Sequence, residues 1–411
     1  MKRVLIVMLL LALPVIAEDR HMGVATCASS VCHGSTTERS GGRILQNEYV
    51  TWWQQDPHAR AYQTLLSDAS RRMANKLGIG PAHEAPACLA CHADAVPEAQ
   101  RGPRFQLSDG VGCEACHGGA ERWLSSHTEK DATHEDNLRR GLTALPRIEV
   151  RAAVCGACHV GDGERFASHD IMGAGHPRLQ FELATYHRFW PSHHRENDAY
   201  RARKPAPDDM ALWRAGQLYA ARHLLQGLRS ERFMATPFWP ELAYFDCHAC
   251  HTPMNAGKWQ PREASALPPG AVRLNDSALL MVGWWLAATD PAAARRWREA
   301  VASLHGASQQ GRAPVRQVSA QLLQQLDRLQ GIPITAEPDW TRMLAAIKAD
   351  ALGARFSDYM TAEQVLMVIA LLERPQRSEQ AFDELYRSLA DQHRFDARAF
   401  LEALRDYEAG R

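Results

Sequence analysis

The chain has 411 residues, and its 47 lysines and arginines balance 47 aspartates and glutamates, so the formal net charge is zero. This balance argues against a nucleic-acid partner, because phosphate contacts require a marked excess of basic residues. The sequence contains no phosphate-binding loop and no dinucleotide-binding fingerprint, so a nucleotide-dependent enzyme is not indicated.

The first 17 residues have the pattern of a secretory signal peptide. Lys2 and Arg3 precede an apolar run that ends at Ile16, and Ala17 precedes two acidic residues. The run of about 13 residues is shorter than the ~20 needed to span a bilayer. We expect cleavage after Ala17, export to the periplasm and no membrane span in the mature chain. Loss of Lys2 and Arg3 leaves 45 basic and 47 acidic residues, a net charge of −2.

All ten cysteines lie in five short motifs, and each motif ends in a histidine. Four motifs have the spacing C-x-x-C-H, whereas the first has four residues between its cysteines. This spacing is typical of covalent haem c attachment, in which two thiols add to one porphyrin and the histidine binds its iron as proximal ligand. The sequence therefore predicts five haem c groups. From first to fifth, the motifs are Cys27, Cys32 and His33; Cys88, Cys91 and His92; Cys113, Cys116 and His117; Cys155, Cys158 and His159; and Cys247, Cys250 and His251.

Disulfides and zinc sites are the alternatives for paired cysteines. A disulfide needs no histidine after its second cysteine. A structural zinc site pairs two such hairpins and does not require every one to end in C-H. For Cys27 and Cys32, whose loop is wider, a disulfide remains the alternative to a haem. The histidine at each motif favours haem.

The chain divides by composition after the last motif. Of 19 histidines, 17 lie at or before His251, and prolines and a glycine interrupt regular structure over residues 255–272. We predict a signal peptide over residues 1–17, a pentahaem cytochrome c domain over 18–262 and a haem-free helical domain over 263–411. The fold class is mainly α. Short helices and loops wrap the haems of the first domain, and an all-α domain follows.

Several helices can be placed from their signals. A helix over residues 48–66 should break at Pro57. In the second half we expect five to seven helices in antiparallel hairpins, with apolar stripes that form a core. The helix signals there are a cap at Asn275 or Asp276, a start at Asp290 and Pro291 with an end at Gly306, a periodic run over 315–329, a capping box at Thr361, and caps at Ser378 and Asp396.

Several segments of the haem-motif region resemble the cytochrome c-554 type of multihaem cytochrome. The resemblance spans residues 24–262, and the helical tail resembles the C-terminal extension of some multihaem members. It implies single-electron transfer in the periplasm through closely packed haems, most of them with two histidine ligands. The chain departs from the four-haem members by its fifth motif and its long tail. The segments that carry the resemblance run from Tyr49 to Ala61, from Pro81 to His92, from Gly112 to His127 and from Met172 to Leu183.

The resemblance implies that His58, His83, His127 and His176 are distal iron ligands, because each lies inside a matching segment. For the remaining haem, His193, His194 and His169 stay open as alternatives. His248 lies between the cysteines of its own motif and is expected to be exposed. A ligating imidazole usually donates its second N–H to a carboxylate or carbonyl. The candidate carboxylates are Asp56, Glu84 and Glu182.

We expect an electron carrier rather than an enzyme, with periplasmic or membrane-bound redox proteins as partners. The alternative is a haem-based oxidoreductase that acts on a small nitrogen or sulfur compound at one five-coordinate haem, with His169, Arg178 and Tyr186 near it. Every motif ends in histidine, so the lysine-ligated haem of pentahaem nitrite reductases is not predicted. A docking role for the helical half would need an exposed apolar patch. Trp284, Trp285 and Trp297 are the candidates for such a patch, with core burial as the alternative.

Overall fold

The computed structural model describes residues 19–39, 44–195, 197–202, 204, 208–234, 239–251, 267–268, 271–330, 339–353, 358–374, 377–408 and 410. Over these residues the chain is helical, with two isolated β-bridges and no strand, which confirms a mainly α fold. The predicted signal peptide and most of the predicted domain junction lie outside the described residues. Among the described helices, none is long and apolar enough to cross a membrane.

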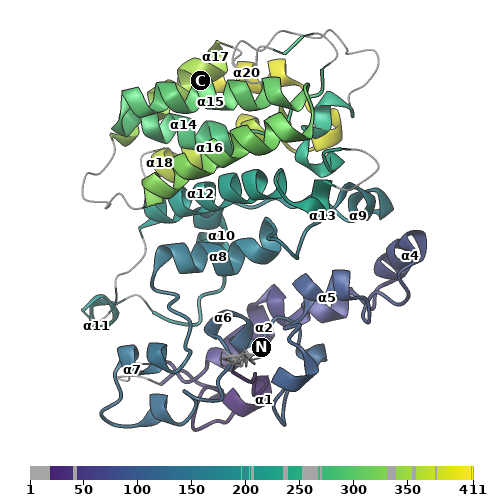
Figure 1. Ribbon diagram of the computed structural model, residues 1–411. Coiled ribbons are helices and arrows are strands. Elements are labelled where there is room, and N and C mark those ends of the chain that lie inside the picture. The colour runs from purple at the N-terminus through teal and green to yellow at the C-terminus, as the bar shows by residue number, and fades with distance from the viewer. Residues whose placement is uncertain are drawn as a thin grey trace, which may run out of the picture.

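Short helices and loops form the N-terminal part of the molecule (Figure 1). The predicted helix over 48–66 breaks at Pro57 as expected, because the Asp56 carboxylate accepts from the His58 N–H and starts a new helical turn. The apolar clusters here are small: one consists of Val24, Trp52 and Ala59. This part therefore has little side-chain core of its own. Its helices are α1 (Val24–Cys27), α2 (Glu48–Gln55), η1 (Pro57–Arg60), α3 (Ala61–Thr64), α4 (Asp68–Leu77), α5 (Pro86–His92), η2 (Glu98–Gln100), η3 (Leu107–Asp109), α6 (Cys113–His117), η4 (Ser126–Thr128) and α7 (His134–Arg139).

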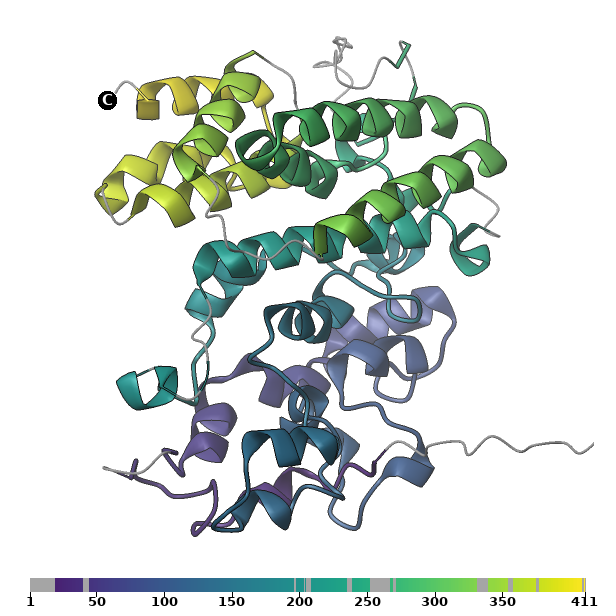
Figure 2. The same ribbon diagram turned by 60° about the vertical axis from the view of Figure 1, so that its left-hand side comes forward.

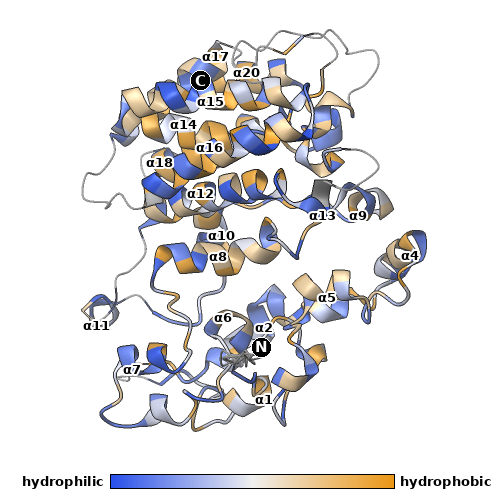
Figure 3. Ribbon diagram, in the orientation of Figure 1, coloured by the Kyte–Doolittle hydropathy of each residue, from blue (hydrophilic) through white to orange (hydrophobic). Residues whose placement is uncertain are grey.

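Longer helices stack in the C-terminal part, and Figure 2 shows them as a separate tier above the short helices. Figure 3 shows that hydrophobic residues concentrate along this tier. The connecting helices are α8 (Ile148–His159), α9 (His169–Ala174), α10 (Leu183–Phe189), α11 (Asp198–Arg201), α12 (Asp209–Gly227), α13 (Glu231–Met234), η5 (Leu242–Tyr244) and η6 (Cys247–Ala249). Beyond residue 271 follow α14 (Ser277–Thr289), α15 (Pro291–Ser308), α16 (Arg312–Gln330), α17 (Trp340–Leu352), α18 (Tyr359–Glu373), η8 (Glu379–Phe382), α19 (Asp383–Ser388), η9 (Gln392–Arg394) and α20 (Ala397–Glu408).

One continuous apolar core joins the fourth-motif helix to the chain's end. It extends from Ala152 in α8 to Tyr407 in α20. Helix α12 lies at its centre and packs against α8, α10, α14, α16 and α18. Helices on both sides of the predicted boundary at residue 262 therefore share an interior, while the boundary itself stays a prediction.

The helix signals of the second half hold with two corrections. Asp276 and Asp290 are the N-caps of α14 and α15, and the Asp396 carboxylate accepts from the Arg398 N–H at the start of α20. Helix α15 runs two residues past Gly306. The capping box at Thr361 is wrong, because Asp358 caps α18 and accepts from the Thr361 N–H. The carboxylate of Asp358, three residues before Thr361, forms the cap in place of the expected Thr361 hydroxyl.

The three tryptophans considered for an apolar patch lie in the core. Trp284, Trp285 and Trp297 are 4%, 3% and 1% exposed. The indole N–H of Trp297 donates to the Leu279 carbonyl at 2.8 Å. Core burial is therefore their role, and they form no docking patch.

Candidate haem-binding sites

Helical turns bring the two cysteines and the histidine of the regular motifs to one side of the chain. The second, third and fourth motifs end α5, α6 and α8, and the fifth begins at η6. Residues three and four apart lie on the same face of a helix. The wider first motif reaches a similar geometry, since the His33 N–H donates to the Cys27 carbonyl at 3.3 Å. None of the ten cysteines forms a disulfide.

Each motif histidine faces one other histidine. A metal–imidazole bond is about 2.0 Å, so two imidazoles on opposite sides of one metal ion have ring centroids about 6 Å apart. The five observed separations fit this value. They are 6.3 Å for His33 and His127, 6.3 Å for His92 and His176, 6.1 Å for His117 and His193, 5.9 Å for His159 and His58, and 6.2 Å for His251 and His169.

Several of these rings are oriented by a hydrogen bond at Nδ1, which leaves Nε2 to reach a metal. His58 Nδ1 donates to Asp56 at 2.8 Å, and His33 Nδ1 donates to Glu48 at 2.9 Å. Backbone carbonyls serve the same purpose elsewhere. Carbonyl acceptors are Ala61 for His92 at 3.1 Å, Trp123 for His127 at 3.2 Å and Pro177 for His176 at 2.6 Å. Such anchoring of the second ring nitrogen is typical of metal-bound histidine.

Burial keeps other facing rings neutral, as iron ligation requires. Desolvation lowers the pKa of His117 to about 3, and it lowers the pKa of His159 and of His193 to about 4. His159 also stacks on Phe181 with a centroid distance of 4.9 Å. The hydrogen bond from His58 to Asp56 instead raises the pKa of His58.

The histidines predicted as distal ligands have different surroundings in the structure. His58, His127 and His176 each face a motif histidine. His83 lies elsewhere, with its ring 6.3 Å from that of Tyr62 and its Nε2 3.5 Å from Glu84. Of the open alternatives, His193 and His169 face motif histidines.

His194 and the three candidate carboxylates have different surroundings. The ring of His194 contacts those of His193 and Tyr200. Of the carboxylates, Asp56 holds a facing histidine, whereas Glu182 caps α10. Glu48, which the sequence did not single out, holds His33. It begins a helix 15 residues farther along the chain, and no local spacing signals that contact.

Cysteine contacts bring the motifs close to one another. The thiols of Cys27 and Cys113 are in hydrogen-bonding contact, which joins the first motif to the third. Those of Cys91 and Cys158 join the second motif to the fourth. Cys116 lies close enough to Cys155 and Cys158 to interact with them electrostatically, so the third motif is near the fourth.

A cavity lies between the fourth motif and the fifth. It is lined by His159 of the fourth motif and Cys247 of the fifth, and by the apolar rings of Phe166 and Phe181. Helix α18 contributes Met360 and Glu363 to the same wall. Residues of two attachment motifs therefore share the wall of one cavity.

The family model for cytochrome c554 and c-prime matches residues 26–118. This segment is similar to that family. It contains the first, second and third motifs, and the match supports covalently bound haem c as the cofactor of this segment and electron transfer as its role. A search of curated proteins and a search of solved structures found no match.

Proposed function

We propose that the protein is a periplasmic electron carrier with five haem c groups, each held by two histidines. The observation that carries this proposal is the set of five facing histidine pairs, one for each motif. Two imidazoles saturate the iron, and a saturated iron exchanges single electrons rather than binding a substrate.

The proposed ligand set consists of the five motif histidines together with His58, His127, His169, His176 and His193. His83 is left out of it, because its ring lies beside Tyr62 and Glu84. The Nδ1 contacts to Asp56 and Glu48 raise the basicity of two of the ligating rings and hold their planes fixed. A rigid ligand set limits the rearrangement that accompanies each change of iron charge.

The cysteine contacts support an order for the haems. The first haem would exchange electrons with the third, and the third with the fourth. The fourth would also meet the second through Cys91 and Cys158, and the fifth through the cavity beside His159 and Cys247. The fourth motif would then hold the haem at the junction of the network, and the first, second and fifth motifs would hold those at its ends.

Catalysis at an open haem would need a motif histidine without a facing histidine, and each of the five has one. The residues considered for such a pocket have other contacts. Arg178 is paired with Glu363 at 2.6 Å, and the Tyr186 hydroxyl donates to the Gln180 carbonyl at 2.7 Å. These contacts support electron transfer over the alternative.

The test is EPR of the oxidised, purified holoprotein, with haem quantified by pyridine haemochrome and mass spectrometry in the same sample. Five haems per chain, all low-spin, are expected. A high-spin signal that integrates to one haem and responds to nitrite, hydroxylamine or nitric oxide would refute the saturated ligand set. N-terminal sequencing of the secreted protein checks the export prediction, for which residue 18 should be the first.

A further inference from the structure

The fifth motif is held by helices that carry no haem motif. His248, between its two cysteines, donates from Nε2 to the Gln392 carbonyl of η9 at 2.6 Å. Its ring contacts those of Tyr359 and Phe395, at centroid distances of 5.7 and 5.8 Å. The expected exposure of His248 is therefore not observed, because its side chain is 16% exposed. The middle of the haem-binding loop is inserted into the C-terminal helices.

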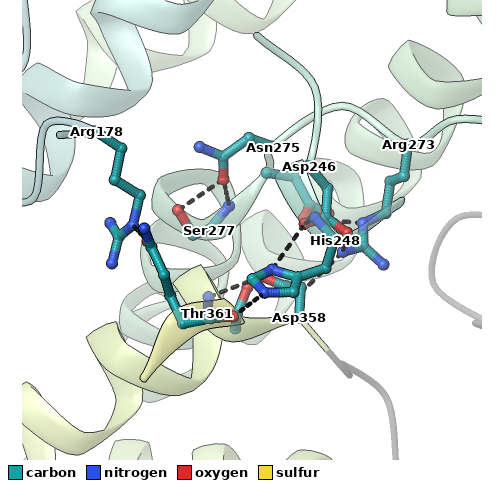
Figure 4. Close-up of polar contacts among 10 residues, drawn as sticks. Arg178, Asp246, His248, Arg273, Asn275, Ser277, Asp358 and Thr361 are labelled. Atoms are coloured by element: carbon teal, nitrogen blue, oxygen red, sulfur yellow. Dashed lines mark hydrogen bonds and ion pairs between the residues drawn. The ribbon is translucent and has the colours of Figure 1, made fainter. Parts of the chain in front are cut away.

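A buried ion cluster lies directly before the first cysteine of this motif (Figure 4). Asp246 caps η6, and its carboxylate pairs with Arg273 at 2.7 Å. The same guanidinium pairs with Asp358, the cap of α18, at 3.1 Å. Asp276, the cap of α14, lies 3.9 Å from Arg273 Nε and pairs with the buried His305 at 3.0 Å. One arginine thus links the motif to the first turns of two C-terminal helices.

Backbone contacts reinforce this link. The Asp246 N–H donates to the Arg273 carbonyl at 2.9 Å, and the Asn275 N–H donates to the Tyr244 carbonyl at 2.8 Å. Phe245 and Leu274 form an isolated antiparallel bridge between these bonds. The chain just before the motif is therefore paired with the chain just before α14.

The cluster also carries unbalanced charge. Three carboxylates, each under 10% exposed, surround one guanidinium, and the groups that face them are His248 and His305. Burial raises the pKa of Asp246 to about 6, with the charge of Asp358 as a second cause. Charges in such a dry site act strongly on a neighbouring iron, because little water screens them.

We propose that the C-terminal helices hold the fifth haem in place, that Arg273 is the residue that positions it, and that the ion cluster around Arg273 sets the reduction potential of this haem. The inference rests on the proposed function, since it requires a haem at Cys247 and Cys250. Helix α18 also contributes Met360 and Glu363 to the cavity beside Cys247. The helical half is thus part of a haem site.

Charge and position can be separated with two substitutions that act in opposite directions. Arg273→Met leaves two carboxylates without their cation, which stabilises ferric iron and lowers the potential of the fifth haem. Asp246→Asn removes a negative charge and raises it. Each shift should be of order tenfold in the ferric–ferrous equilibrium, about 59 mV for a one-electron couple. A purely structural role would shift both variants in the same direction.

The experiment is an EPR-monitored redox titration of each full-length holoprotein at pH 8, where Asp246 is ionised. His169→Ala identifies the fifth haem, because its signal becomes high-spin. Arg316→Met is the matched control, since Arg316 pairs with Glu231 at an exposed site and should leave every potential unchanged. If Arg273→Met does not fold, Arg273→Lys replaces it, and the reduction potential of its fifth haem should equal the native value. Asp246→Asn then still tests the predicted rise in that potential.

Opposite shifts confined to the fifth haem would support the inference. Unchanged potentials, or shifts of the same sign, in a protein with five haems would overturn it and leave the proposed function intact. A native protein with four haems and free thiols at Cys247 and Cys250 would instead overturn the five-haem proposal, and this inference with it.

Discussion

Replacement of His193 by alanine should open one haem of the five, whereas the same change at His194 should open none. The two residues are neighbours, and His193 faces a motif histidine, with its ring 6.1 Å from that of His117. Metal ligation on both sides requires about 6 Å between ring centroids. The ring of His194 lies 5.9 Å from that of His193 and 5.4 Å from that of Tyr200.

The magnitude follows from the five pairs. His193→Ala should convert about one fifth of the iron to high-spin, because each pair serves one iron. EPR spin quantification of the oxidised protein measures this fraction, and carbon monoxide binding to the reduced protein provides a second reading. The His194→Ala variant is the control and should keep all iron low-spin. A high-spin fraction in His194→Ala, or an all-low-spin spectrum in His193→Ala, would refute the ligand assignment.

Three further variants probe the remaining sites. His83→Ala should leave every haem low-spin, and a new high-spin signal in its EPR spectrum would restore His83 as a ligand. Asp56→Asn weakens the hydrogen bond to His58 and should raise the reduction potential of the fourth haem in a redox titration. The reason is that a less basic imidazole stabilises ferric iron less. An unchanged potential would contradict this. Trp297→Ala should lower the free energy of unfolding by about 3–5 kcal/mol in urea, because the side chain is 1% exposed. The exposed Trp53 provides the control, and equal losses at both tryptophans would contradict the core assignment.

The ring planes also predict the spectra. The pairs at His33 and His251 are near-parallel, at 11° and 30°, whereas the other three are inclined by 69° to 89°. Parallel imidazole planes split the iron d orbitals more than perpendicular planes do. The low-spin spectrum should therefore contain two rhombic components and three of high anisotropy, and five equivalent signals would contradict the geometry.

The attachment motifs could be read from the sequence because their chemistry is local. Two cysteines and a histidine at fixed short spacing lie on one turn of chain, whatever the rest of the molecule does. The mainly α fold followed in the same way from caps and apolar periods. The capping box at Thr361 failed where two local signals competed and Asp358 was closer to the helix start.

The partner of each motif histidine was decided by tertiary structure. His127 faces His33 and His58 faces His159, each from a distant part of the chain, and the choice of His193 over His194 depends on where His117 lies. The resemblance to known cytochromes suggested His58, His83, His127 and His176 as distal ligands, because each lies in a segment that carries the resemblance. It gave no means of telling which of these four histidines lies opposite a motif histidine.

The sequence by itself determined the cofactor chemistry and the helical class, since both depend on spacings of a few residues. Tertiary structure alone decided that the fifth motif is anchored by Arg273 and by helices α14 and α18. It also decided that the apolar core crosses the compositional boundary. Contacts of this kind depend on how distant elements pack, and packing is governed by the whole set of buried surfaces rather than by any local pattern.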